Sequence, residues 1–84
     1  MLKQVETGDM VFIGEGQEGI GAVREIRKAD FVLYVENAGE FEIPATAIVG
    51  VHDRKVIVNP LKLPRRLLEA VGHAHDSEDP KLVG

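Results

Sequence analysis

A glycine-rich segment near the N-terminus has the spacing of a dinucleotide-binding fingerprint. Gly14, Gly16 and Gly19 form the pattern G-x-G-x-x-G after an apolar run, and Glu36 follows 20 residues after Gly16. In such a fingerprint the glycines let the backbone approach a pyrophosphate at a helix N-terminus, and the acid binds a ribose hydroxyl. Apolar residues between positions 20 and 26 recur every three residues, which is compatible with the helix that this chemistry needs.

Three observations argue against a bound dinucleotide. The parallel sheet that forms such a site has helices on both faces and needs well over the 84 residues of this chain. Glu15 and Glu18 would place carboxylates in the loop that must accept phosphate. Gly21 would weaken the required helix by about 1 kcal/mol. We therefore expect a glycine-rich hairpin without a cofactor, and a kink or bulge between Gly21 and Glu25.

The C-terminal segment contains the side chains that most resemble metal ligands. His73, His75 and Asp76 supply the imidazole and carboxylate groups that a divalent metal favours. The segment is otherwise polar and small, and ordering it into a site costs chain entropy, so we expect no bound metal. Ser77, the only serine, lies in the same segment without a scaffold to hold a base beside it. The sequence therefore predicts no catalytic residues and no enzyme.

A basic group near the end of the chain is the best candidate for contact with a polyanion. It consists of Lys62, Arg65 and Arg66, which Arg54 and Lys55 can join if the fold brings them near. A formal net charge of −4 and an aromatic content of 5% argue against nucleic acid, because its binding depends on clustered cations and exposed rings. An RNA- or ribosome-associated protein is thus the alternative function, and a solvated basic edge is the simpler interpretation.

Composition indicates one intracellular globular domain. The chain is 44% hydrophobic and 29% charged, and it contains no cysteine, so disulfides and thiolate sites are excluded. A secreted domain of this size usually needs disulfides, which favours a cytoplasmic location. No apolar run approaches the roughly 20 residues that span a bilayer, so we expect no membrane insertion.

The segment between Asp9 and Asn59 has the pattern of a small all-β domain. Short apolar runs are separated by turn-forming residues every eight to twelve positions. The clearest run is 40–43, where two glutamates alternate with Phe41 and Ile43 and should point outward. Because so short a chain cannot cover both faces of a flat sheet, we predict a five- or six-stranded antiparallel β-barrel.

A short helix is predicted after this region. Pro64 is suited to a helix start and Gly72 to its end. Leu67, Leu68 and Val71 share one face, so the helix must place an apolar stripe on the barrel or on a second subunit. These three residues are the predicted interface.

Two stretches resemble the PRC-barrel family. Residues Gly19–Ile26 are similar to its second-strand pattern G-x-IG-x-V-x-x-I, and Phe41–Val51 followed by Lys55–Val58 is similar to its step IP-x-x-x-I-x-x-V into the last strand. The resemblance implies a small SH3-like β-barrel. In the reaction-centre subunit and the ribosome maturation factor that contain this barrel, it is a binding module. The family has no common set of catalytic residues.

Together these observations predict three segments and a function class. Residues 1–63 form the barrel, 64–72 the helix, and 73–84 a flexible polar tail. The expected function is that of a non-catalytic PRC-barrel-like binding or assembly module with a protein partner or a second copy of the chain, and nucleic acid is the less favoured partner.

Overall fold

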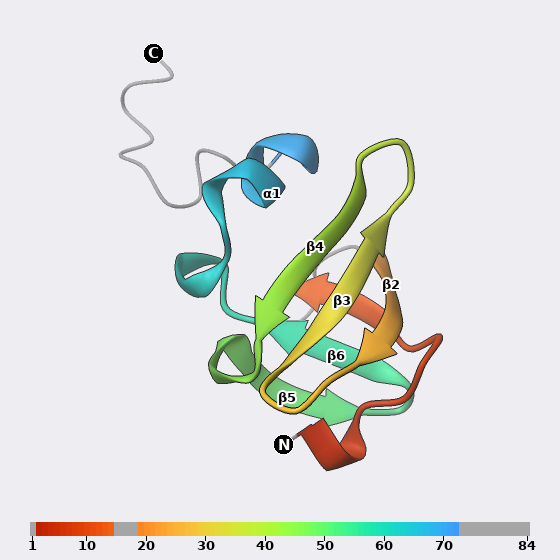
Figure 1. Cartoon of the computed structure of the whole chain (residues 1–84). Helices are drawn as coiled ribbons and strands as arrows, with labels where there is room; N and C mark the ends of the chain where they lie inside the picture. Colours follow the sequence, from red (N-terminus) through yellow and green to blue (C-terminus); the bar gives the residue numbers. More distant parts are fainter. Residues whose placement is uncertain (1, 15–18, 73–84) are drawn as a thin grey trace.

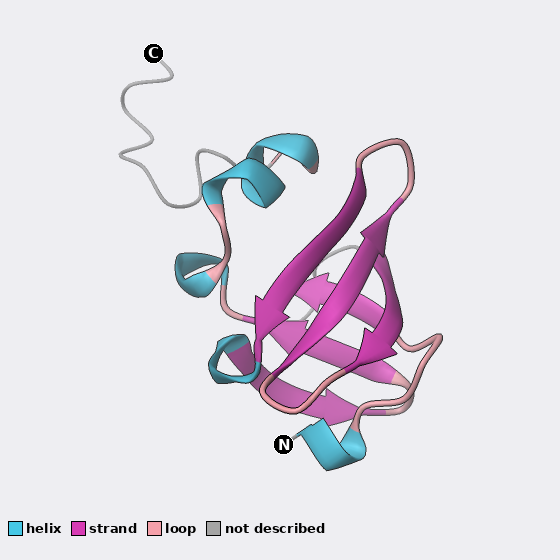
Figure 2. Ribbon diagram, in the orientation of Figure 1, coloured by secondary structure: helices cyan, strands magenta, loops and turns pink. Residues whose placement is uncertain are grey.

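The computed structural model describes residues 2–14 and 19–72 and shows a mainly β chain (Figure 1, Figure 2). Within these ranges the strands are β1 (Met10–Ile13), β2 (Gly19–Ile26), β3 (Asp30–Val35), β4 (Gly39–Pro44), β5 (Ile48–His52) and β6 (Lys55–Val58). Short 3₁₀ turns lie at η1 (Leu2–Gln4), η2 (Ala45–Ala47) and η3 (Pro60–Lys62), and the helix α1 spans Arg65–Ala70. The predictions of a mainly β fold and of a short C-terminal helix are confirmed, and of the predicted five or six strands the structure has six in the described residues. In the described part of the chain, no helix is long and apolar enough to cross a membrane.

The six strands form one mixed sheet. Their order is β4-β3-β2-β1-β6-β5, and every neighbouring pair is antiparallel except β1 and β6. These two run parallel, with Met10 opposite Lys55 and Ile13 opposite Val58. The prediction of an antiparallel sheet is therefore wrong at this pair, because β6 returns to the first strand of the chain instead of extending a simple meander.

The predicted closure into a barrel is not confirmed. The hydrogen-bonded order begins at β4 and ends at β5, so these two strands are the edges of the sheet in the described residues. Pro44 ends β4 and η2 then redirects the chain, so the two edges follow each other in sequence without pairing. Figure 1 shows how the core is covered instead, since β2, β3 and β4 run across β5 and β6 and the sheet folds over itself.

The bend of the sheet uses the features predicted in β2. Its register with β3 shifts between Val23 and Glu25, which is the expected bulge. Gly21 is required nearby, because a Cβ atom there would overlap the carbonyl oxygen of Tyr34 and lie 2.9 Å from Cδ1 of Leu33. The strand β2 also occupies the segment that a dinucleotide fingerprint needs as a helix, so that interpretation is wrong. Gly16 lies outside the described residues.

The core lies between the two halves of the folded sheet. Along the strands, core residues alternate with residues that face outward. In β4, for example, Phe41 and Ile43 are buried and their neighbours Glu40, Glu42 and Pro44 are exposed. The side chains with no exposed surface include Val11, Phe31, Leu33, Ile43, Val56, Val58 and Leu67. Because Leu67 belongs to α1, the helix is part of the same core as the sheet.

An ion pair between the buried Asp9 carboxylate and the exposed side chain of Arg54 connects the start of β1 to the turn between β5 and β6. Asp9 is 2% exposed, and its carboxylate accepts a hydrogen bond of 2.6 Å from Nε of Arg54 and one of 2.9 Å from the Glu6 amide. Burial alone raises the pKa of Asp9, but the two hydrogen bonds and the charge of Arg54 outweigh it, so the pKa lies below its ordinary value. The carboxylate therefore stabilises the fold in its ionised form.

The backbone around this pair joins three strands. The Asp9 carbonyl accepts a hydrogen bond of 2.8 Å from the Val23 amide, and the Arg54 carbonyl accepts one of 3.1 Å from the Met10 amide. Asp53 and Arg54 have φ angles of 53° and 64°, the left-handed conformation that a tight two-residue hairpin requires. This turn places the Arg54 side chain at Asp9.

We expect Asp9→Asn to lower the free energy of unfolding at neutral pH by about 2 kcal/mol, because it weakens hydrogen bonds to a buried charge. The pKa of Asp9 is lower in the folded than in the unfolded chain, so its contribution is complete above the ordinary value of 3.8 and is lost as the pH falls through the lowered value. The variant should therefore lose less further stability than the parent between about pH 5 and pH 2. Urea unfolding followed by circular dichroism measures both effects.

The matched control is Glu36→Gln, which neutralises an exposed carboxylate in the β3–β4 turn. Equal losses in the two variants at neutral pH would contradict the role of the Asp9 pair.

Candidate functional site

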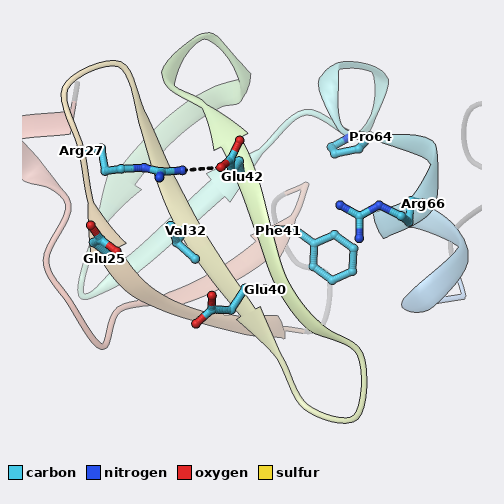
Figure 3. A pocket seen from close by; sticks show the side chains of 8 residues that line it. All are labelled: Glu25, Arg27, Val32, Glu40, Phe41, Glu42, Pro64 and Arg66. Carbon is cyan, nitrogen blue, oxygen red and sulfur yellow. Dashed lines mark ion pairs between the residues drawn. The ribbon is translucent and has the colours of Figure 1, made fainter.

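A surface groove lies on the outer face of β2, β3 and β4, beside the start of α1 (Figure 3). Its volume is about 610 Å³, which is within the range of ligand sites. The lining residues come from the end of β2 and the turn after it, from β3 and β4, and from the start of α1: Glu25, Arg27, Val32, Glu40, Phe41, Glu42, Pro64 and Arg66.

Val32 and Phe41 lie at the floor of the groove with little exposed surface, and carboxylates border them. Val32 points to the outer face of β3 and is only 7% exposed, because it lies opposite Glu25 on β2 and opposite Glu42 on β4. Glu40 and Glu42 are exposed on this same face, while Phe41 and Ile43 are buried. The predicted outward positions of the two glutamates are therefore confirmed, and alternation places acidic groups around an apolar centre.

Ion pairs hold Arg27, Glu40 and Glu42 at the groove. Arg27 lies 2.9 Å from a carboxylate oxygen of Glu42 and 3.0 Å from one of Asp30. Hydrogen bonds to Glu42 and Asp30 raise the pKa of Arg27 above its ordinary value, and the bond to Glu42 has the larger effect. Glu40 is 2.7 Å from Nε of Arg24. Within the described residues Glu25 forms no ion pair, so its charge is available to a ligand.

The wall of the groove opposite Arg27 comes from α1. The guanidinium of Arg66 lies 4.6 Å from the centre of the Phe41 ring, in the geometry of a cation–π contact. Figure 3 shows Arg66 beside this ring, with Pro64 next to it. The helix is held in this position because Leu67 and Leu68, at 0% and 1% exposure, are buried in the core.

The predicted interface residues are thus covered by their own chain. Leu67 and Leu68 belong to the core, and Val71 is partly buried against it. The stripe was expected to pack on the sheet or on a second subunit, and in the structure it packs on the sheet. An interface with a second subunit through these residues stays a prediction, and it would require α1 to leave the core.

The predicted basic group is divided between two places. Lys62, Arg65 and Arg66 are exposed near α1, where Arg65 lies 3.3 Å from Glu69 and Arg66 lies over Phe41. Arg54 binds the buried Asp9, and the ammonium of Lys55 is 5.6 Å from the centre of the Phe12 ring. Contact of Lys62, Arg65 and Arg66 with a polyanion stays a prediction.

The predicted metal candidates His73, His75 and Asp76 lie outside the described residues, and so does Ser77. In residues 2–14 and 19–72, no group of three or more His, Cys, Asp or Glu side chains is placed to hold a metal ion.

The groove combines residues that the sequence analysis interpreted separately or did not single out. Arg27 and Asp30 are three positions apart across the turn from β2 to β3, a spacing that signals a possible local ion pair. Val32 carries no such signal, because an apolar residue in an apolar run does not show which face of the strand it occupies. The approach of Arg66 to Phe41 depends on the packing of α1 and has no local signature.

No protein-family model, curated protein or solved structure matches this chain. The function proposed below therefore relies on the residues of the groove and on the sequence patterns described above.

We expect Leu68→Ala to lower the free energy of unfolding by about 2–4 kcal/mol, because it removes buried methyl groups and leaves a cavity in the core. The control Leu61→Ala makes the same chemical change at a side chain that is 71% exposed, and it should alter stability by less than about 0.5 kcal/mol. Urea unfolding of both variants is the measurement. A Leu68 variant as stable as the Leu61 variant would show that α1 is not packed in the core.

Proposed function

We propose that this chain is a non-catalytic binding module of the PRC-barrel-like type, which holds an extended segment of a protein partner in the groove beside α1. The observation that carries the proposal is the charged border of the groove, in which the carboxylates of Glu25 and Glu42 flank a small apolar centre at Val32 and Arg66 forms a wall. Such a surface combines an apolar contact with fixed polar groups, the arrangement by which a binding site orients its ligand.

The charges of the groove favour a partner segment with a cationic side chain. Arg27 is neutralised by Glu42 and Asp30, and Arg66 rests on the Phe41 ring. Glu25 forms no ion pair within the described residues, and the side chain of Glu40 is 54% exposed beside Arg24. A lysine or arginine of the partner would therefore find an acceptor at Glu25, while a neighbouring apolar side chain covers Val32.

The two stretches that resemble the PRC-barrel family support the fold part of this proposal. Gly19–Ile26 forms the strand whose Gly21 approaches β3 closely, and the Ile43–Pro44 step precedes η2 and β5. The proposal includes a barrel-like sheet and, because the chain lacks cysteine, a cytoplasmic location. The alternative function, association with RNA or the ribosome through Lys62, Arg65 and Arg66, is tested by the same experiment.

We expect labelled ten-residue peptides with a central leucine and an adjacent lysine to bind the full chain more tightly than peptides with glutamate in place of that lysine. Glu25→Lys should weaken binding of the lysine peptide by about fivefold, since it replaces the free acceptor by a like charge. Fluorescence anisotropy at low salt measures the affinities.

Glu36→Lys is the matched control, because it makes the same charge change in the turn between β3 and β4. Equal weakening by the two variants would indicate an effect of net charge and contradict the groove. Absence of binding to the lysine peptides, together with binding of single-stranded RNA that is lost in Arg65→Ala plus Arg66→Ala, would replace the proposal by the RNA alternative.

A further inference from the structure

The groove beside α1 presents its charges in a fixed order. Figure 3 shows Arg66 on one side of the groove, Val32 in the middle and Glu25 on the other side. The exposed side chains of Lys62 and Arg65 add positive charge near α1. A complementary segment therefore carries acidic groups where it passes α1, and a cation beside an apolar side chain where it reaches β2 and β3.

The segment that follows α1 in the sequence carries these groups in the same order. Three of the four residues 76–79 are carboxylates, and Lys81 and Leu82 come directly after Pro80. Residues 73–84 lie outside the described residues, and Lys81 is the only lysine or arginine in the undescribed parts of the chain. Lys81 and Leu82 thus combine a cation with an apolar neighbour, as the groove requires of its ligand.

The connection between α1 and Lys81 is long enough to reach across the groove. Gly72 has a φ angle of 78°, the left-handed conformation that ends a helix and turns the chain off its axis. It follows Arg66 by six residues, or about 9 Å at the rise of a helix. The strands β4 and β2 are two spacings apart, or about 10 Å. Lys81 follows Gly72 by nine residues, which span up to about 30 Å when extended.

From this charge order and this reach, we propose that residues 76–82 occupy the groove of their own chain when no partner is bound. The carboxylates of 76–79 lie at Arg66, Lys81 pairs with Glu25, and Leu82 covers Val32. The inference rests on the proposed function, because it gives the chain itself a segment of the kind that the groove takes from a partner. A partner then binds by displacing this internal competitor.

The tether makes a weak contact effective. A short flexible connection gives its two ends an effective concentration in the range of about 1 mM. A segment that would bind as a separate peptide with a dissociation constant of about 1 mM therefore occupies the groove of its own chain about half of the time. The apparent affinity for a partner falls in proportion to the fraction of open groove.

The direct test is the nuclear Overhauser contact between the methyl groups of Leu82 and Val32 in the isotope-labelled full chain. We expect this contact in the parent and its loss in Lys81→Glu, which places a like charge at Glu25. The double variant Glu25→Lys plus Lys81→Glu should restore it, since it exchanges the two charges and preserves the pair. The control Lys3→Glu makes the same charge change at an exposed residue of η1 that does not line the groove, and it should leave the contact unchanged.

Peptide affinity separates this inference from the proposed function. Lys81→Glu should bind the lysine peptide at least about twofold more tightly than the parent and than Lys3→Glu, because its groove is open. Equal binding by the three chains, without the methyl contact, would overturn the inference and leave the proposed function intact. A methyl contact without binding of the lysine peptide to any of them would support the inference and contradict the binding of a partner.

A mixture of labelled and unlabelled chains distinguishes the chain's own segment from that of a second copy. Methyl contacts between the two kinds of chain would show that the segment is exchanged between copies, and they would overturn the proposal. So would a contact that Lys81→Glu leaves unchanged, or one that the double variant fails to restore, because Lys81 would then not be paired with Glu25.

Discussion

The parallel pairing of β1 with β6, with the ion pair between Arg54 and the buried Asp9 at its start, is the constraint on which the rest of the structure depends. The two residues are 45 positions apart, so the whole chain from β1 to β5 lies between them. A parallel neighbour can be reached only by a long crossover, and here the crossover consists of β2, β3, β4, η2 and β5. Because all six strands remain in one hydrogen-bonded sheet, β2, β3 and β4 bend across β5 and β6 to cover the core.

The bend explains why the outer face of the sheet holds the candidate site. The inner faces of the two halves contact each other and leave Val32, Glu40 and Glu42 outside. The helix α1 then fills the remaining opening of the core with Leu67 and Leu68, which brings Arg66 over Phe41. A groove between a rigid strand pair and an anchored helix is the result, and its charges are positioned by strand register and local ion pairs rather than by flexible loops.

Local signals made much of the fold predictable, whereas the long-range contacts were not. Alternation identified the outward glutamates of β4, and Pro44 marked its end because proline has no amide to donate. The stripe of α1 was also recognised, but a stripe does not specify which surface covers it. Strand direction carries no signature in period-two alternation, so the parallel pair was missed. Likewise, the burial of Asp9 depends on an arginine that is distant in the sequence, and the groove depends on how α1 meets β4.

The parallel pairing is tested most directly by nuclear Overhauser contacts between backbone protons of β1 and β6 in the isotope-labelled full chain. The structure predicts contacts in which residue numbers increase together, from Met10 near Lys55 to Ile13 near Val58. Contacts in the opposite order, with Met10 near Val58, would contradict the account, and so would a β6 whose only strand neighbour is β5.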